Sequence, residues 1–100
     1  MKQLLLLPAA CRDLENICEW YELQSPGLGA RFKSVVHDEL LRIQTSPTMY
    51  LNEEVDLKKA YLPRFPHKIL FVIEEDNILV TAIADMRRMP GYYDGRPRSI

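Results

Sequence analysis

The sequence is short of cysteine, and the placement of its two cysteines excludes a disulfide framework. Cys11 and Cys18 are the only cysteines. Seven residues apart on one helix, they would lie about 10 Å from each other, which is beyond the roughly 7 Å limit for a disulfide. Their spacing also fails to match a zinc site. We therefore expect buried or half-buried structural thiols.

Long apolar runs are missing as well. No stretch approaches the roughly 18–20 residues that span a bilayer. The leucine run at 4–7 is too short for the core of a signal peptide, and charged residues return at Arg12 and Asp13. The sequence thus predicts a cytoplasmic protein that does not interact with membranes.

The common sequence signatures of catalysis are absent too. There is no glycine-rich phosphate loop, no serine or cysteine nucleophile beside a plausible base, and no metal-ligand spacing. We expect neither a cofactor nor a metal.

Net charge is close to zero, at −1 over 100 residues, which excludes a protein that coats nucleic acid by charge alone. The charge is unevenly spread. Residues 1–55 hold 5 Lys and Arg against 8 Asp and Glu, whereas residues 56–100 hold 8 against 6. A local basic site in the second half therefore stays open.

The apolar pattern predicts one α+β domain over residues 1–100, in the order β-α-α-β-β-β. Helical spacing covers 10–24, from the first position provided by Pro8, and 28–43, up to Ser46 and Pro47. Strands are expected at four places, namely 2–7, 57–62, 68–73 and 78–84. Segment 49–56 reads as irregular and acidic, and 85–100 as a loop or short terminal turn. The helical hairpin should cover one face of a small, mostly antiparallel sheet and leave the other face partly open.

The chemistry-bearing residues gather in the second half. If the last two long strands pair about Asp76, then Lys68 and Asp85 lie at the same end of the hairpin. Four basic side chains could then converge there, namely Arg64, Lys68, Arg87 and Arg88. Arginine forks suit phosphate oxygens, and Tyr92 or Tyr93 can stack on a base. The alternative is that these arginines are solvated or paired with Asp85.

The sequence leaves the roles of two ring-bearing side chains, His67 and Trp20, undecided. His67 follows Pro66 beside the basic residues, and is either part of a site or a surface residue at the start of a strand. Trp20 lies one step from the apolar stripe of its helix, so it is either the edge of the core or an anchor for a partner.

Four stretches together resemble the RelE/ParE superfamily of toxins from bacterial type II toxin–antitoxin modules. Two lie in the helical hairpin, from Ala10 to Glu22 and from Ser25 to Phe32. The third, Arg-Phe-Pro-His-Lys-Ile at 64–69, resembles an Arg-Phe-Pro-Tyr-x-Ile segment of the family. The fourth, at 87–93, resembles its Arg-Arg-x-Pro-x-Tyr-Trp ending. The resemblance implies a small α+β fold, growth inhibition, and a co-expressed antitoxin that wraps the toxin.

Members of this superfamily act on one of two different cellular targets. RelE-like members cut mRNA on the ribosome, and by that pattern Arg87 would stabilise the scissile phosphate, Tyr93 would stack on a base or assist proton transfer, and Lys68 would add a positive charge. RelE-like members also use two lysines on the preceding strand. The corresponding positions in this sequence lie near Ala60 and Leu62. ParE-like members instead inhibit DNA gyrase, and for them the basic end would be a binding surface made of Arg64, His67, Arg88 and Tyr92.

The near-neutral charge favours the gyrase hypothesis, because ribosome-binding members are strongly basic. A fold that has lost toxicity and only binds its antitoxin is the third hypothesis. In each case an acidic, amphipathic antitoxin segment should cover the hairpin or a sheet edge, at Trp20, Leu28 and Phe32.

Overall fold

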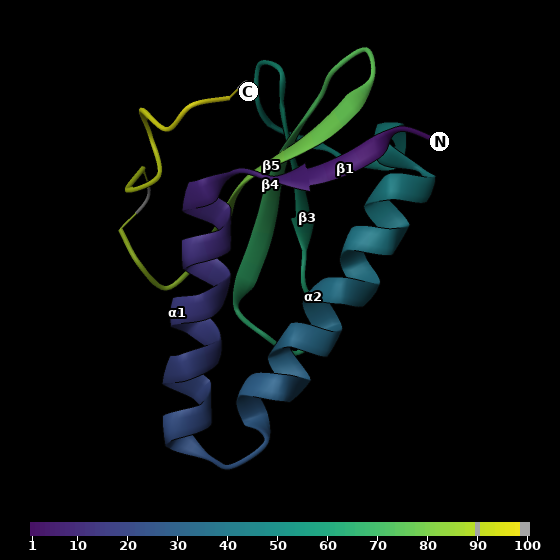
Figure 1. Ribbon diagram of the computed structural model, residues 1–100. Coiled ribbons are helices and arrows are strands. Elements are labelled where there is room, and N and C mark those ends of the chain that lie inside the picture. Colours follow the sequence, from purple (N-terminus) through teal and green to yellow (C-terminus); the bar gives the residue numbers. More distant parts are fainter. Residues whose placement is uncertain (90, 99–100) are drawn as a thin grey trace.

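Two antiparallel helices cover one face of a five-stranded sheet (Figure 1). The structure is a computed structural model and describes residues 1–89 and 91–98. Its elements are β1 (Gln3–Leu6), α1 (Pro8–Gln24), α2 (Leu28–Thr45), a 3-10 turn η1 (Pro47–Met49), β2 (Asn52–Glu54), β3 (Leu57–Tyr61), β4 (His67–Ile73) and β5 (Asn77–Asp85). The α+β class and the helical hairpin predicted from the sequence are confirmed.

The sheet has the strand order β1-β5-β4-β3-β2 and is mostly antiparallel. Only the β1–β5 pair is parallel. The short strand β2 is a correction, because segment 49–56 was expected to be irregular. Three acidic or polar residues carry no periodic signal. The strand pairs with β3 at Asn52 and Glu54, and Asp56 takes a left-handed conformation, with φ 58°, in the turn between the two strands.

One irregularity in β5 decides which way its last side chains point. Leu70 pairs with Ala82 while Phe71 pairs with Val80, so Thr81 is an extra residue on β5. A bulge of this kind reverses the alternation of side chains beyond it. As a result Ile83 packs in the core beneath the helices, and Asp85 points to the same side.

The main core lies between the helices and the sheet. Phe32, Val36 and Ile43 of α2 are buried against Ile69 and Phe71 of β4, as the helical spacing predicts. The two helices approach closely at Gly29, where an added Cβ would lie 2.5 Å from the carbonyl oxygen of Cys18. Cys18 is half-buried, whereas Cys11 is exposed, contrary to expectation, because its position falls outside the apolar stripe.

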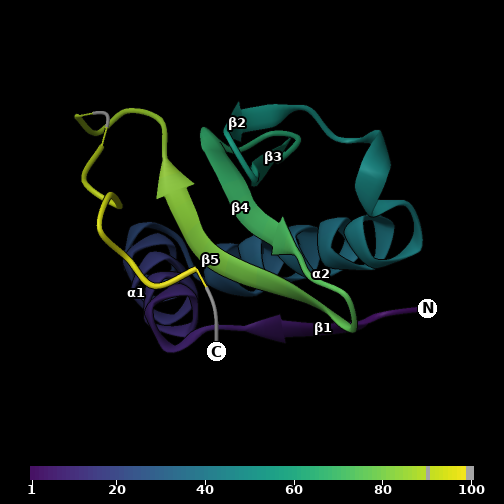
Figure 2. The same ribbon diagram turned by 90° about the horizontal axis from the view of Figure 1, so that it is seen from above.

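The opposite face of the sheet, which we expected to be partly open, is partly covered by the C-terminal segment. A small cluster of Leu57, Leu70 and Ala84 lies there, with Tyr92 and Tyr93 packed against it. The C-terminal segment, residues 86–89 and 91–98, runs from the end of β5 back along that strand, on the side of α1 (Figure 2). The C-terminal segment, which the sequence predicts to be a loop, thus covers part of the sheet face opposite the helices.

Candidate functional site

The start of β4 and the end of β5 bring three of the predicted site residues, His67, Lys68 and Arg87, to one end of the sheet. His67 pairs with Asp85, and Lys68 pairs with Ala84. Because neighbouring residues of a strand face opposite sides, His67 and Lys68 point to opposite faces. The sheet therefore divides the predicted set into two groups.

On the helix side, His67 is buried among aromatic rings. Tyr21 and Phe32 flank its imidazole, with ring centroids 5.9 and 5.0 Å away, and Phe65 packs against both of these rings. Its Nε2 lies 3.8 Å from Asp85 Oδ2, and its Nδ1 has no hydrogen-bond partner within the described residues. Burial lowers the pKa of His67, while the nearby Asp85 carboxylate opposes that shift.

For two residues, burial contradicts the predicted role in contacting a target or an antitoxin. His67 exposes 1% of its surface and Phe32 exposes none. Both belong to the core, so neither offers surface to a target or an antitoxin. Trp20 is 48% exposed and Leu28 is half-buried, and both remain open to a partner.

Arg87 lies at the rim beside His67 and is held by Asp85. Its Nε and Nη2 donate to the two oxygens of that carboxylate at 3.0 and 2.9 Å, and its backbone N–H donates at 2.9 Å. The guanidinium carbon is 5.7 Å from the centre of the Trp20 ring. Hydrogen bonds from Arg87 lower the pKa of Asp85. The alternative in which an arginine pairs with Asp85 therefore holds for Arg87.

A pocket of about 350 Å³ opens at this point between α1 and the strand ends. Its lining combines aromatic, apolar and charged groups, namely Asn16, Ile17, Trp20, Tyr21, His67, Asp85 and Arg87.

On the other face, Lys68 and Tyr93 meet at Glu53. The Lys68 ammonium donates to Glu53 Oε1 at 2.8 Å, and the Tyr93 hydroxyl donates to Oε2 at 2.9 Å. Burial by itself would raise the pKa of Glu53, but the hydrogen bonds from Lys68 and Tyr93, together with the positive charges of Lys68 and Lys59, outweigh it and lower that pKa. Sequence reasoning missed Glu53, because its partners lie 15 and 40 residues away and no local pattern marks it.

The remaining predicted residues do not converge on one concave end. Arg64 lies in the β3–β4 loop, where it lines a hollow together with Val35, Asp38, Arg42 and Pro63. Arg88 stacks on Tyr92 at 3.8 Å from the ring centre. The Tyr92 hydroxyl in turn accepts the backbone N–H of Asp85 at 2.6 Å.

The C-terminal segment closes the edge of β5 that β1 leaves unpaired. The Asp13 carboxylate on α1 accepts the Ile83 N–H at 2.9 Å, and it also accepts two hydrogen bonds from Arg96 at 2.6 and 2.9 Å. Arg96 also donates to the Thr81 carbonyl at 3.3 Å. Side chains thus satisfy the backbone of a strand edge that would otherwise be open.

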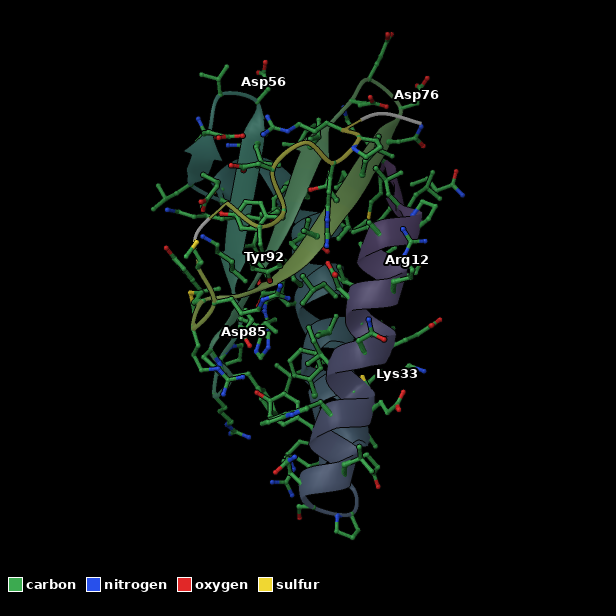
Figure 3. All side chains as sticks on the ribbon, turned by 90° about the vertical axis from the view of Figure 1, so that its left-hand side faces the viewer. Arg12, Lys33, Asp56, Asp76, Asp85 and Tyr92 are labelled. Atoms are coloured by element: carbon green, nitrogen blue, oxygen red, sulfur yellow. The ribbon has the colours of Figure 1, made fainter. Side chains whose placement is uncertain are left out.

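A second hollow, of about 590 Å³, lies between α1 and this C-terminal segment. Figure 3 looks onto this side, with Arg12 on α1 and Tyr92 on the C-terminal segment. The basic members of its lining are Arg12, Arg88 and Arg96. Sequence reasoning did not single out Arg12, whose place opposite the C-terminal arginines depends on the fold.

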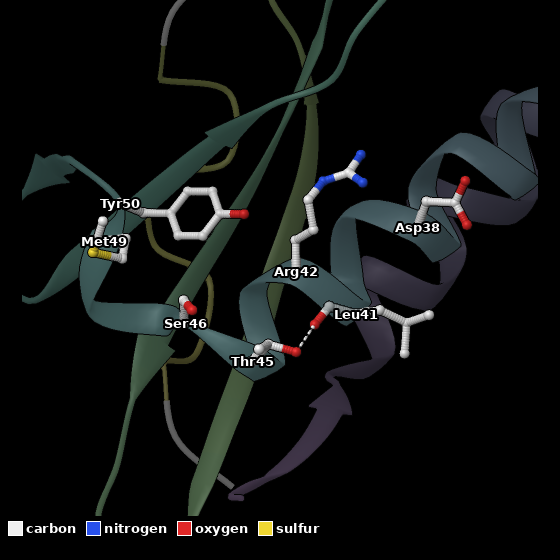
Figure 4. A pocket seen from close by; sticks show the side chains of 7 residues that line it. All are labelled: Asp38, Leu41, Arg42, Thr45, Ser46, Met49 and Tyr50. Carbon is white, nitrogen blue, oxygen red and sulfur yellow. Dashed lines mark hydrogen bonds between the residues drawn. The ribbon is translucent and has the colours of Figure 1, made fainter.

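Another hollow lies elsewhere, at the end of α2 (Figure 4). It measures about 650 Å³ and is lined by Asp38, Leu41, Arg42, Thr45, Ser46, Met49 and Tyr50. Beside it, the Tyr50 hydroxyl donates to the buried Glu39 carboxylate at 2.6 Å. Burial, with that hydrogen bond, raises the pKa of Tyr50 to about 12. None of the predicted site residues lines this hollow.

Within residues 1–89 and 91–98, no helix is both long enough and apolar enough to cross a membrane. The same residues contain no group of three or more His, Cys, Asp or Glu side chains arranged to hold a metal ion.

Comparison with known proteins gives a match by structure. No protein-family model matches the chain, and the search of curated proteins finds no significant match. The fold matches a chain of the chromosomal ParDE toxin–antitoxin system from P. aeruginosa with a TM-score of 0.77 and 18% sequence identity. The match covers 85% of this chain and 96% of that chain. At this identity the likeness concerns the fold, and the chain has the RelE/ParE-like fold that its sequence predicts.

Proposed function

We propose that this chain is the toxin of a bacterial type II toxin–antitoxin module and that it arrests growth in the cytoplasm by binding DNA gyrase. The match in fold to a chain of a ParDE toxin–antitoxin system supports the class. The sequence stretches that resemble the RelE/ParE superfamily support it independently.

The placement of Lys68, Arg87 and Tyr93 favours binding over RNA cleavage. A ribonuclease of the RelE-like pattern would need these three groups around one cleavage site, where positive charge stabilises the developing negative charge. Here Lys68 and Tyr93 both bind Glu53 on one side of the sheet. Arg87 instead forms a bidentate ion pair with Asp85 on the other side. This separation is the observation that carries the proposal.

The second partner is an antitoxin. The hairpin keeps Trp20 half-exposed and Leu28 half-buried, and such apolar surface suits an amphipathic segment. The exposed arginines near the end of the chain call for acidic residues in that segment.

Induced expression in bacteria, with and without the product of the neighbouring reading frame, tests both parts. We expect growth arrest that this product relieves, intact mRNA by primer extension, and gyrase–DNA cleavage complexes. Arg88→Ala, which removes an exposed arginine of the proposed binding surface, should weaken the arrest, while Arg31→Ala, which removes an exposed arginine of α2, should leave it unchanged.

Other outcomes would overturn the proposal in distinct ways. Codon-specific mRNA cuts that vanish in Arg87→Ala would establish a ribosome-dependent ribonuclease instead. Normal colony counts without the neighbouring product would leave a protein that binds an antitoxin and lacks toxicity.

A further inference from the structure

The hollow at the end of α2 is a surface that the proposed function leaves unused. One of its walls is a stripe at helical spacing along α2, made of Asp38, Leu41, Arg42 and Thr45. Met49 of η1 lies toward the other end of the hollow (Figure 4). The residues to which we assign the target and the antitoxin are not part of its described lining. A different partner can therefore occupy it.

Two apolar side chains of this hollow are left exposed. Leu41 is 50% exposed and Met49 is 79% exposed. A single exposed apolar residue is ordinary, but two beside a hollow of about 650 Å³ are typical of a contact with another protein. Methionine is unbranched and flexible, so it adapts to an incoming side chain of another molecule. This surface thus suits a partner that brings an apolar side chain.

The charged members of the lining balance each other, which limits the chemistry of the occupant. Asp38 supplies an exposed carboxylate and Arg42 an exposed guanidinium. The Arg42 Nε donates to the buried Glu39 carboxylate at 3.3 Å, and no hydrogen bond within the described residues occupies its two Nη groups. Arg64 lies close by, since it lines an adjacent hollow together with Asp38 and Arg42. Two carboxylates and two guanidiniums share this surface, so a strongly acidic or strongly basic partner gains little from it.

A second copy of this chain is the partner that such a surface fits. In an isologous dimer each patch meets a copy of itself, and a patch with one sign of charge would repel that copy. Here the acid and the base lie one turn apart on α2, on either side of Leu41. A two-fold axis beside Leu41 sets the two helices antiparallel. Asp38 of each copy is then brought toward the free Nη groups of Arg42 of the other.

We propose that this chain forms a two-fold dimer through the hollow at the end of α2. Leu41 of each copy enters the hollow of the other, against Met49, and Asp38 pairs with Arg42 across the axis. A single hollow with its rim is a small interface, which is typical of weak and reversible association. The proposal is independent of the toxin hypothesis, because it involves none of the residues assigned to the target or the antitoxin.

Sedimentation velocity of the purified chain over a range of concentrations tests the proposal. We expect the monomer to give way to a dimer as the concentration rises. Leu41→Glu and Leu41→Lys should each weaken self-association at least about tenfold, because like charges then meet across the axis. An equal mixture of these two variants should recover it to within about threefold, because opposite charges then meet. Leu23→Glu, at a 78% exposed position near the end of α1, should change it less than about twofold.

Several results would overturn the dimer. They are a chain that stays monomeric at every concentration, a dimer that Leu41→Glu leaves intact, and a mixture of the two charged variants that does not associate. Leu41 is half-exposed, so both variants should keep the fold, and circular dichroism checks this. If the chain is monomeric and Leu41→Glu instead weakens binding of the neighbouring gene product, the surface belongs to that partner and the proposal fails.

The growth assay separates this failure from failure of the toxin hypothesis. A chain that arrests growth and stays monomeric would refute only the dimer. A chain that dimerises through Leu41 and leaves colony counts normal would refute only the proposed function.

Discussion

Removal of the Asp13 carboxylate should destabilise the protein more than the loss of any other charge on α1. Asp13 joins α1 to two other parts of the chain. Its carboxylate accepts a hydrogen bond from the Ile83 N–H of β5 and two hydrogen bonds from the Arg96 guanidinium of the C-terminal segment. Its side chain is 15% exposed and that of Arg96 is 23% exposed, so water can replace these hydrogen bonds only in part. Asp13→Ala leaves the backbone donor and the guanidinium without their acceptor.

The expected cost follows from those contacts. An unsatisfied buried donor costs about 1–3 kcal/mol, and a hydrogen bond to a charged group contributes about 1.5–3 kcal/mol. Partial exposure of Arg96 reduces the second contribution, so we expect about 2–4 kcal/mol in total. For a domain of this size, 1 kcal/mol shifts the melting temperature by about 4–8 °C, so the midpoint should fall by roughly 10–25 °C.

Thermal unfolding followed by circular dichroism measures this loss, and hydrogen exchange at the Ile83 amide locates it. Glu15→Ala is the matched control, because it removes an exposed carboxylate from the same helix and should change stability by less than about 0.5 kcal/mol. A double-mutant cycle with Arg96→Ala should give a coupling of about 1–2 kcal/mol. The reasoning fails if Asp13→Ala is no worse than Glu15→Ala, or if the Ile83 amide keeps its protection.

Three further predictions concern pH and packing. Because burial lowers the pKa of His67, the unfolded chain takes up a proton near pH 6.5 that the folded chain resists. Stability should therefore fall as the pH drops below 6.5. His67→Phe should flatten that fall in urea unfolding at pH 7.5 and 5.5, and an unchanged difference between the two pH values would count against it. Gly29→Ala should cost about 1–3 kcal/mol, although alanine is the better helix former, because the new methyl group meets the Cys18 carbonyl. A neutral or stabilising result in chemical denaturation would contradict that close contact. Tyr50, with a pKa of about 12, should make stability decline as the pH rises above 10. Tyr50→Phe should remove the last tyrosine transition from an absorbance titration, and loss of an earlier transition instead would disprove the assignment.

Periodic and local features could be predicted from the sequence. The apolar spacing of 10–24 and 28–43 predicted both helices, because one buried stripe repeats along each of them. The β4–β5 hairpin followed from two β-rich runs about Asp76. The short strand β2 did not, because three residues are too few for an alternating pattern to appear.

The candidate site was predictable in its residue types but not in its grouping. The resemblance identified Lys68, Arg87 and Tyr93, and the predicted hairpin register placed Lys68 and Arg87 near one end of the sheet. Their division between two faces could not be foreseen, and neither could the burial of His67. Both depend on which face of the sheet the helices cover.

The local pattern of apolar, charged and turn-forming residues determined the helices and the β4–β5 hairpin. It also determined the resemblance to the RelE/ParE superfamily. The partners of Glu53 and Asp13 were decided by tertiary structure. Glu53 meets Lys68 across 15 residues, and Asp13 meets Arg96 across 83. The extra residue in β5 turns Asp85 toward the helices. Such contacts carry no signal in the sequence, because they depend on how strands pair and on which face the chain later covers.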